Sequence, residues 1–173
     1  YNGIVYLWPR KFSLESYSRA LSDRMFLVAA RNSVLRTIIG SLVAVTVTYC
    51  YAYALSHKTL VMRRFFSILG LITLYFGGGL IPTFLLIRAL GLYDTFFVYI
   101  FPMCFTMFNC LVFLTYFKGI SNEIKESAMI DGANDLKIYV RIIIPISMPV
   151  FACVILFSAV FQWNEYFDCM IYT

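Results

Sequence analysis

Charged residues are scarce in this chain: only 13% of its 173 residues are Asp, Glu, Lys or Arg, whereas 61% are hydrophobic. A soluble globular domain of this size does not need so much apolar surface, so the composition predicts an integral membrane protein. The formal net charge is +5. Lys and Arg lie in clusters between apolar runs rather than along one stripe, and no nucleic-acid partner is therefore expected.

Residues that build catalytic or metal sites are also rare. His57 is the only histidine and lies beside Lys58, which argues against a catalytic triad or a metal site. No two of the five cysteines form a C-x-x-C pair, and four lie inside apolar runs, so we interpret them as small hydrophobic residues. Gly77–Gly79 are not followed by the Lys of a P-loop, so no direct ATP binding of that kind is expected.

Long apolar runs, by contrast, are plentiful and predict four transmembrane helices. The runs cover residues 34–55, 65–87, 95–117 and 142–163. Each has about 20 residues, which is enough for a helix to cross a hydrocarbon core of roughly 30 Å. Helices satisfy their own backbone hydrogen bonds in lipid, and the alternating polarity of a β-barrel is absent. The predicted fold class is an all-α integral membrane protein.

The glycines at 77–79, together with Pro82, interrupt the second apolar run. Irregular backbone at membrane depth is tolerated where it packs against protein or lines a cavity. The sequence leaves both interpretations open, helix packing and the lining of a pathway.

The first 31 residues differ from the rest, because they mix polar and aromatic side chains. We divide the chain into this extramembrane or interfacial segment, residues 1–31, and a transmembrane domain, residues 32–173. The orientation is not settled by charge, because Lys and Arg are balanced between the two sides. No signal peptide is visible, and we expect the chain to be part of a longer one.

The connection over residues 118–141 is longer than a simple link requires. Residues 122–130 contain neither Gly nor Pro and can form about two helical turns, with Ser121 or Asn122 as the N-cap. Gly132 then offers a left-handed turn, which a residue with a Cβ resists by about 1–2 kcal/mol. These features predict a short helix held at the membrane surface by two transmembrane helices. A solvated loop without a partner is the alternative that the residues leave open.

The stretch ESAMIDGANDLKIYVRIIIPISMP resembles the EAA signature of the permease subunits of binding-protein-dependent ABC importers. In that signature E-A-A is followed by D-G-A and then by an Ile/Leu-Pro pair. The matching residues here are Glu126, Ser127, Ala128, Asp131, Gly132, Ala133, Ile144 and Pro145. Ser127 replaces the usual second Ala, which exchanges one small residue for another.

The resemblance extends over nearly the whole chain. RNSVLRTIIGS, YAYALSHKTLVMRR, GGGLIPTFLLIRALGLYDT and FQWNEYFDCMIY are similar to stretches of carbohydrate permeases. YNGIVYLWPRKFSLESY is most similar to a subgroup that pairs with lipoprotein-type binding proteins and imports oligosaccharides or polysaccharide fragments. The resemblance implies a type I ABC importer permease fold, usually of six helices, so one helix is expected before Tyr1 and one after Thr173. It also implies that residues 1–31 are extracellular.

For residues 118–141 the resemblance implies a cytoplasmic EAA loop whose coupling helix docks in a groove of an ATPase subunit. The implied ATPase-coupling residues are Glu126, Ser127, Ala128, Asp131, Gly132 and Ala133. ATP and Mg would then be bound by two partner ATPase subunits, so this chain would be neither an enzyme nor in need of a cofactor. The other implied partners are a second, different permease chain and an extracellular solute-binding lipoprotein. All would assemble in the cytoplasmic membrane of a prokaryotic cell.

Several polar and aromatic residues in or near the apolar runs suit sugar recognition, which needs hydrogen-bonding groups beside aromatic faces. The candidate pathway residues are Tyr75, Phe76, Asn109, Gln162 and Trp163. Ordinary packing and hydrogen bonds between helices are the alternative interpretation.

Two other functional classes fit the composition. An ion-coupled secondary transporter or channel would need a buried, paired carboxylate within a helix, and the central parts of the four runs contain none. An intramembrane enzyme would need a metal-ligand cluster or a catalytic His, which the sequence does not offer.

Overall fold

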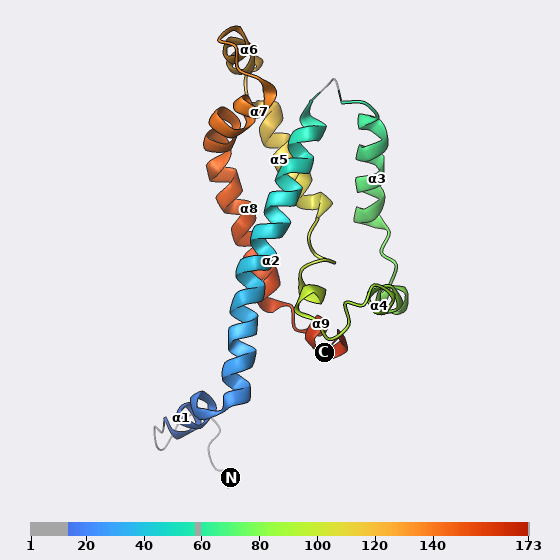
Figure 1. The fold of residues 1–173 in the computed structure, drawn as a ribbon, viewed down its shortest axis with the longest axis vertical. Coiled ribbons are helices and arrows are strands. Elements are labelled where there is room, and N and C mark those ends of the chain that lie inside the picture. The colour runs from blue at the N-terminus through green and yellow to red at the C-terminus, as the bar shows by residue number, and fades with distance from the viewer. Residues whose placement is uncertain (1–13, 58–59, 173) are drawn as a thin grey trace, which may run out of the picture. The chain divides into compact units, whose positions relative to one another are not determined.

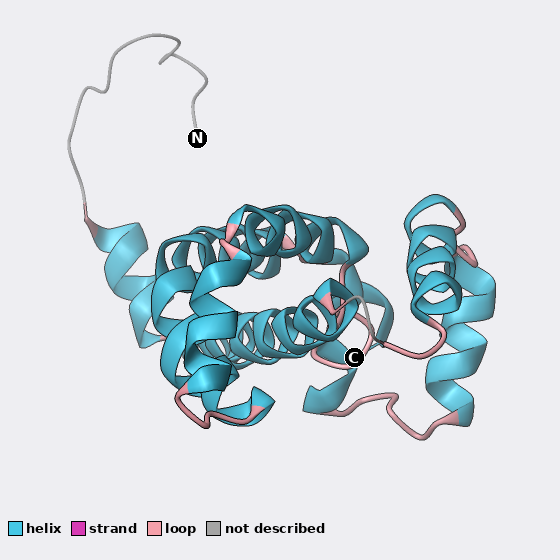
Figure 2. Cartoon of the chain, turned by 90° about the horizontal axis from the view of Figure 1, so that it is seen from above, coloured by secondary structure: helices cyan, strands magenta, loops and turns pink. Residues whose placement is uncertain are grey.

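The computed structural model describes residues 14–57 and 60–172, and all regular structure in these ranges is helical (Figures 1 and 2). The chain divides into two units, residues 1–34 and 35–173. Predictions for residues 1–13 lie outside the described part. In the first unit, α1 (Glu15–Ser22) ends at Asp23, whose carboxylate accepts a hydrogen bond from the Met25 N–H (2.9 Å). The next helix therefore begins at Arg24 with a side-chain cap.

Two long apolar helices dominate the second unit. The helix α2 (Arg24–Ser56) enters it from the first unit, and a second helical stretch covers residues 135–164. That stretch consists of α7 (Asp135–Ile138), the π-turn η2 (Tyr139–Ile143) and α8 (Ile144–Asn164). At about 1.5 Å per residue both are long enough to cross a bilayer, and their mean hydropathies are 1.7 and 2.4.

The expectation of four spanning helices is supported only loosely in the described residues. Between the two long helices lie α3 (Arg63–Tyr75), α4 (Leu80–Ala89), the 3₁₀ turn η1 (Phe96–Tyr99) and α5 (Met107–Gly119). The helices α3 and α4 form one span only if they are counted together across a bend of 118°. The third predicted run is helical mainly from Met107 onward, because Pro102 removes an N–H donor and disfavours helix at the preceding residue.

The core of the second unit is an aromatic cluster that joins α2, α5 and α8. The ring of Tyr49 on α2 lies 5.0 Å from that of Phe113 on α5 and 5.6 Å from that of Phe151 on α8, measured between centroids. Its hydroxyl forms a hydrogen bond with Ser147. Phe113 is fully buried. Edge-to-face contacts of this kind add to the energy of apolar packing, so these three helices share one packed interior.

Candidate functional site

The polar connection at residues 118–141 forms the short helix predicted from the sequence, α6 (Asn122–Ile130), at one end of α5 and α7 (Figure 1). The Ser121 hydroxyl accepts a hydrogen bond from the Glu123 N–H (3.2 Å) and caps its start. The predicted left-handed turn is confirmed, because Gly132 has φ +76°.

Two backbone hydrogen bonds close this turn. The Gly132 N–H donates to Met129 O (3.0 Å), and the Ala133 N–H donates to Ala128 O (2.9 Å). This is the Schellman pattern, in which the residue after the helix cap must be left-handed. The turn thereby satisfies helix-end carbonyls and fixes the direction in which the chain leaves α6.

The six predicted coupling residues divide into an inner and an outer set. Ala128 is buried in the core cluster, and Ala133 packs against it. The other four, Glu126, Ser127, Asp131 and Gly132, are exposed. The neighbouring apolar side chain of Ile130 is 86% exposed. The small residues thus seat α6 on the bundle, while carboxylates and apolar side chains face outward and are available to a partner surface.

The helix α6 connects through the turn at residues 131–134 to the long helical stretch that ends at Asn164. From α7 the chain passes through η2, where the Ile144 N–H donates to Tyr139 O. The Tyr139 ring lies 4.5 Å from the Tyr53 ring of α2. A displacement of α6 would therefore act on α8 through a continuous helical stretch that is packed against α2.

A cavity of about 300 Å³ lies farther along α8, lined by Ala44, Met103, Thr106, Phe108, Asn109, Phe157, Ser158, Phe161 and Gln162. Ser158 and Gln162 are four residues apart on α8 and therefore share a helix face. The Asn109 amide donates to the Ser158 hydroxyl (3.2 Å). These polar groups form a strip beside three phenylalanine rings, each more than half exposed. The combination offers hydrogen bonds on one side and apolar faces on the other.

The structure brings together two of the five predicted pathway residues, Asn109 and Gln162, in this cavity. Tyr75, Phe76 and Trp163 are 78%, 76% and 60% exposed and do not line it. The other lining residues, among them Ser158, were not predicted from the sequence. Ser158 lies four residues before Gln162, and this helical spacing was the pattern that could have indicated that the two share a face.

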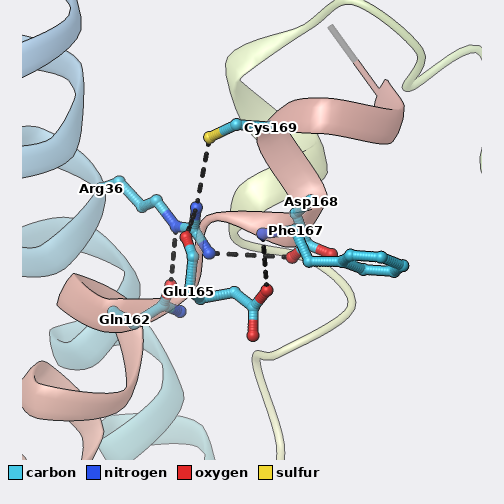
Figure 3. Close-up of polar contacts among 6 residues, drawn as sticks. All are labelled: Arg36, Gln162, Glu165, Phe167, Asp168 and Cys169. Carbon is cyan, nitrogen blue, oxygen red and sulfur yellow. Dashed lines mark hydrogen bonds and ion pairs between the residues drawn. The ribbon is translucent and has the colours of Figure 1, made fainter.

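Beside the cavity a buried arginine binds the end of α8 (Figure 3). Arg36 of α2 is only 3% exposed. Its Nε donates to Gln162 Oε1 (3.1 Å), and its Nη1 donates to the backbone oxygen of Glu165 (2.6 Å). Nη1 also lies 3.5 Å from the Cys169 sulfur. A cation is favourable at a helix C-terminus, where carbonyl groups lack partners.

The charge of Arg36 is balanced by Asp168 of the last helix, α9 (Phe167–Tyr172), at 3.7 Å between Nη2 and Oδ2. Burial raises the pKa of Asp168, Glu165 raises it further, and the Arg36 guanidinium opposes both. This role of Arg36 was not predicted from the sequence. A charged side chain within an apolar run requires a partner of opposite charge or a hydrogen-bond acceptor. The position of Arg36 in the run at residues 34–55 was therefore the pattern that could have indicated such a partner.

No group of three or more His, Cys, Asp or Glu side chains that could hold a metal ion occurs in the described part of the chain. The only histidine, His57, instead makes an edge contact with the Tyr53 ring, at 4.7 Å between centroids.

Comparison with known proteins gives consistent matches, although no family model matches the chain. The chain is 37% identical over 166 residues to the polygalacturonan/rhamnogalacturonan transport system permease protein YtcP of Bacillus subtilis (strain 168), covering 96% of this chain and 58% of that protein. It is 33% identical over 173 residues to the inner membrane ABC transporter permease protein YcjP of Escherichia coli (strain K12), covering 96% and 61%.

A solved structure agrees with these relatives. The crystal structure of a bacterial ABC transporter involved in the import of the acidic polysaccharide alginate matches with a TM-score of 0.92 and 34% identity. The match covers 99% of this chain and 61% of that one. The chain therefore spans less than two thirds of the length of the proteins it matches.

Proposed function

Because this chain belongs to the permease proteins of ABC transporters, we propose that it forms part of the membrane-spanning subunit of an ATP-driven importer of oligosaccharides or polysaccharide fragments. The observation that carries the proposal is the match to the alginate importer over 99% of the chain. The relatives named for polygalacturonan, rhamnogalacturonan and alginate support a carbohydrate substrate.

Permease subunits are not themselves catalytic, and ATP hydrolysis is assigned in this proposal to two separate ABC ATPase subunits, which would bind ATP and Mg. The further partners are a second permease chain, different from this one, and an extracellular solute-binding lipoprotein. The complex would lie in the cytoplasmic membrane of a prokaryotic cell. The apolar helices of this chain support a membrane location.

The proposed coupling step would use the exposed surface of α6. Its exposed residues Glu126, Ser127, Asp131 and Gly132 would contact an ATPase subunit, while Ala128 anchors the helix to the bundle. Closure of the two ATPases on ATP would move α6. The continuous stretch from α7 to α8 would carry this movement to the cavity, whose walls include residues of α8. Access to the cavity would then alternate between the two sides of the membrane.

The cavity suits one sugar unit better than an ion. Amide and hydroxyl groups of Asn109, Ser158 and Gln162 offer hydrogen bonds to sugar oxygens, and the phenylalanine rings offer apolar faces to ring C–H groups. None of the side chains lining it carries a formal charge. Tyr75, Phe76 and Trp163 do not line the cavity and would contact substrate elsewhere on the pathway.

The proposed energy source is tested by uptake into proteoliposomes that contain the complete complex, with trigalacturonate and an alginate trisaccharide as probes. We expect uptake of at least one probe to require ATP inside the vesicle and to persist when ion gradients are collapsed by ionophores. Uptake that continues without ATP and stops with the ion gradient would instead support a secondary transporter.

The proposed substrate contact is tested by Asn109→Leu, which removes the amide at nearly constant volume. We expect the KM for uptake to rise about three- to tenfold, as for the loss of one or two hydrogen bonds, with ATPase activity unchanged. The matched control is Thr115→Val on the same helix, whose hydroxyl donates to Leu111 O (2.8 Å) and which does not line the cavity. Equal KM values for both variants would place Asn109 outside the pathway.

A further inference from the structure

The orientation of the Gln162 amide is set from outside the cavity. A guanidinium can only donate hydrogen bonds, so the Arg36 Nε contact requires the carbonyl oxygen of Gln162 on its side (Figure 3). The NH₂ group is then the other branch of the amide and lies on the side of Gly40. Arg36 itself is not among the residues that line the cavity.

The NH₂ group of Gln162 packs against Gly40 and makes no hydrogen bond to any other described residue. A Cβ at position 40 would lie 2.8 Å from Gln162 Nε2, so Gly40 makes the space in which this amide fits. Its carbonyl oxygen is already occupied by Arg36. The N–H groups are therefore the donors that Gln162 can offer to a molecule in the cavity, next to Ser158 and Asn109.

Arg36 is in turn held by groups that follow the cavity in sequence. Glu165 supplies a backbone oxygen, Asp168 a carboxylate and Cys169 a sulfur. The three partners span the C-terminal cap of α8 and the start of α9. The guanidinium is thus held by three groups that do not themselves line the cavity.

We propose that Arg36 is a positioning residue for substrate recognition: held by Glu165 and Asp168, it fixes Gln162 with its NH₂ group directed to a sugar oxygen in the cavity. The proposal rests on the proposed function, because it assumes a carbohydrate in this cavity. To the proposed function it adds a residue that determines which substrate group is recognised. The favoured ligand group is an acceptor oxygen, such as a hydroxyl, ring or carboxylate oxygen, at the position facing Gln162.

The test uses the double variant Arg36→Met/Asp168→Asn in the complete complex, so that neither buried charge is left alone. With trigalacturonate or the alginate trisaccharide as the probe, we expect KM to rise about fivefold, as for one lost hydrogen bond, while the maximal rate changes little. Gln162→Ala should give the same increase. The triple variant should show no further increase, because both changes remove one interaction. Arg88→Met, at an exposed arginine, is the matched control.

A wild-type KM in the double variant, or additive effects in the triple variant, would overturn the proposal and leave Arg36 as a counter-charge for Asp168 only. A structure of the double-variant complex by electron cryomicroscopy gives a second, independent readout. We expect the Gln162 side chain to leave its position beside Gly40, and an unchanged position would also overturn the proposal. If the wild-type complex imports neither probe, the proposed function fails, whereas the position of Gln162 still decides whether Arg36 orients it.

Discussion

Replacing Gly132 with aspartate is expected to leave the complex assembled in the membrane and to lower ATP-driven uptake about 5- to 30-fold. Gly132 has φ +76°, a backbone conformation that costs a residue with a Cβ about 1–2 kcal/mol. A free-energy difference of this size changes an equilibrium constant about 5- to 30-fold. No atom lies within 4 Å of a Cβ built at this position, so the core is not disturbed. The strain and the added carboxylate act on the turn that would meet the ATPase. Uptake and substrate-stimulated ATPase activity in proteoliposomes measure the effect.

Gly91→Asp is the control for this variant, because Gly91 also has a positive φ (68°) and open space around its Cβ. It follows α4, at the other end of the second unit from α6 (Figure 1). We expect it to cost a similar amount of folding energy without uncoupling transport from ATP hydrolysis. Full coupling in the Gly132 variant, or equal losses in both variants, would contradict a docking role for the turn.

The single change Arg36→Met should lower the stability of the assembled complex by about 3–5 kcal/mol, because it leaves the buried Asp168 carboxylate without its partner. Removing both charges in Arg36→Met/Asp168→Asn should recover most of the loss, since an ion pair replaced on both sides is often close to neutral. The apparent unfolding temperature in detergent, compared with that of Arg88→Met, measures the difference. Equal unfolding temperatures for the single and double variants would show that the pair is not a stabilising unit.

The extent to which the fold follows from the sequence differs between the apolar runs. Continuous apolar residues at 34–55 and 142–163 predicted two helices that the structure contains. The glycines before Leu80 predicted an interruption, but hydropathy carries no information about its direction, and the bend of 118° depends on backbone angles such as φ +79° at Gly79. The turns before Met107 were missed, because their residues are as apolar as those of a helix.

In the candidate site, features set by neighbouring residues could be predicted from the sequence, whereas contacts between residues far apart in the sequence could not. The left-handed Gly132 and a helix cap at Ser121 or Asn122 follow from neighbouring residues and were predicted, and the structure places the cap at Ser121. The contact between Arg36 and Gln162 joins positions 126 residues apart. No local pattern specifies which residue meets a buried arginine; only the packing of α2 against the end of α8 does. Polarity alone was enough to select Asn109 and Gln162, but not to place them in one cavity.

The central claim is that α6 contacts a separate ATPase, and a photo-crosslinking amino acid at position 130 tests it most directly. Ile130 is 86% exposed at the end of α6, whereas Ile138, the control position, is 1% exposed in the core. In membranes containing the complete complex, we expect irradiation to link position 130, but not position 138, to an ATPase subunit. Crosslinks from position 130 to lipid alone, in a complex that still transports, would contradict the account.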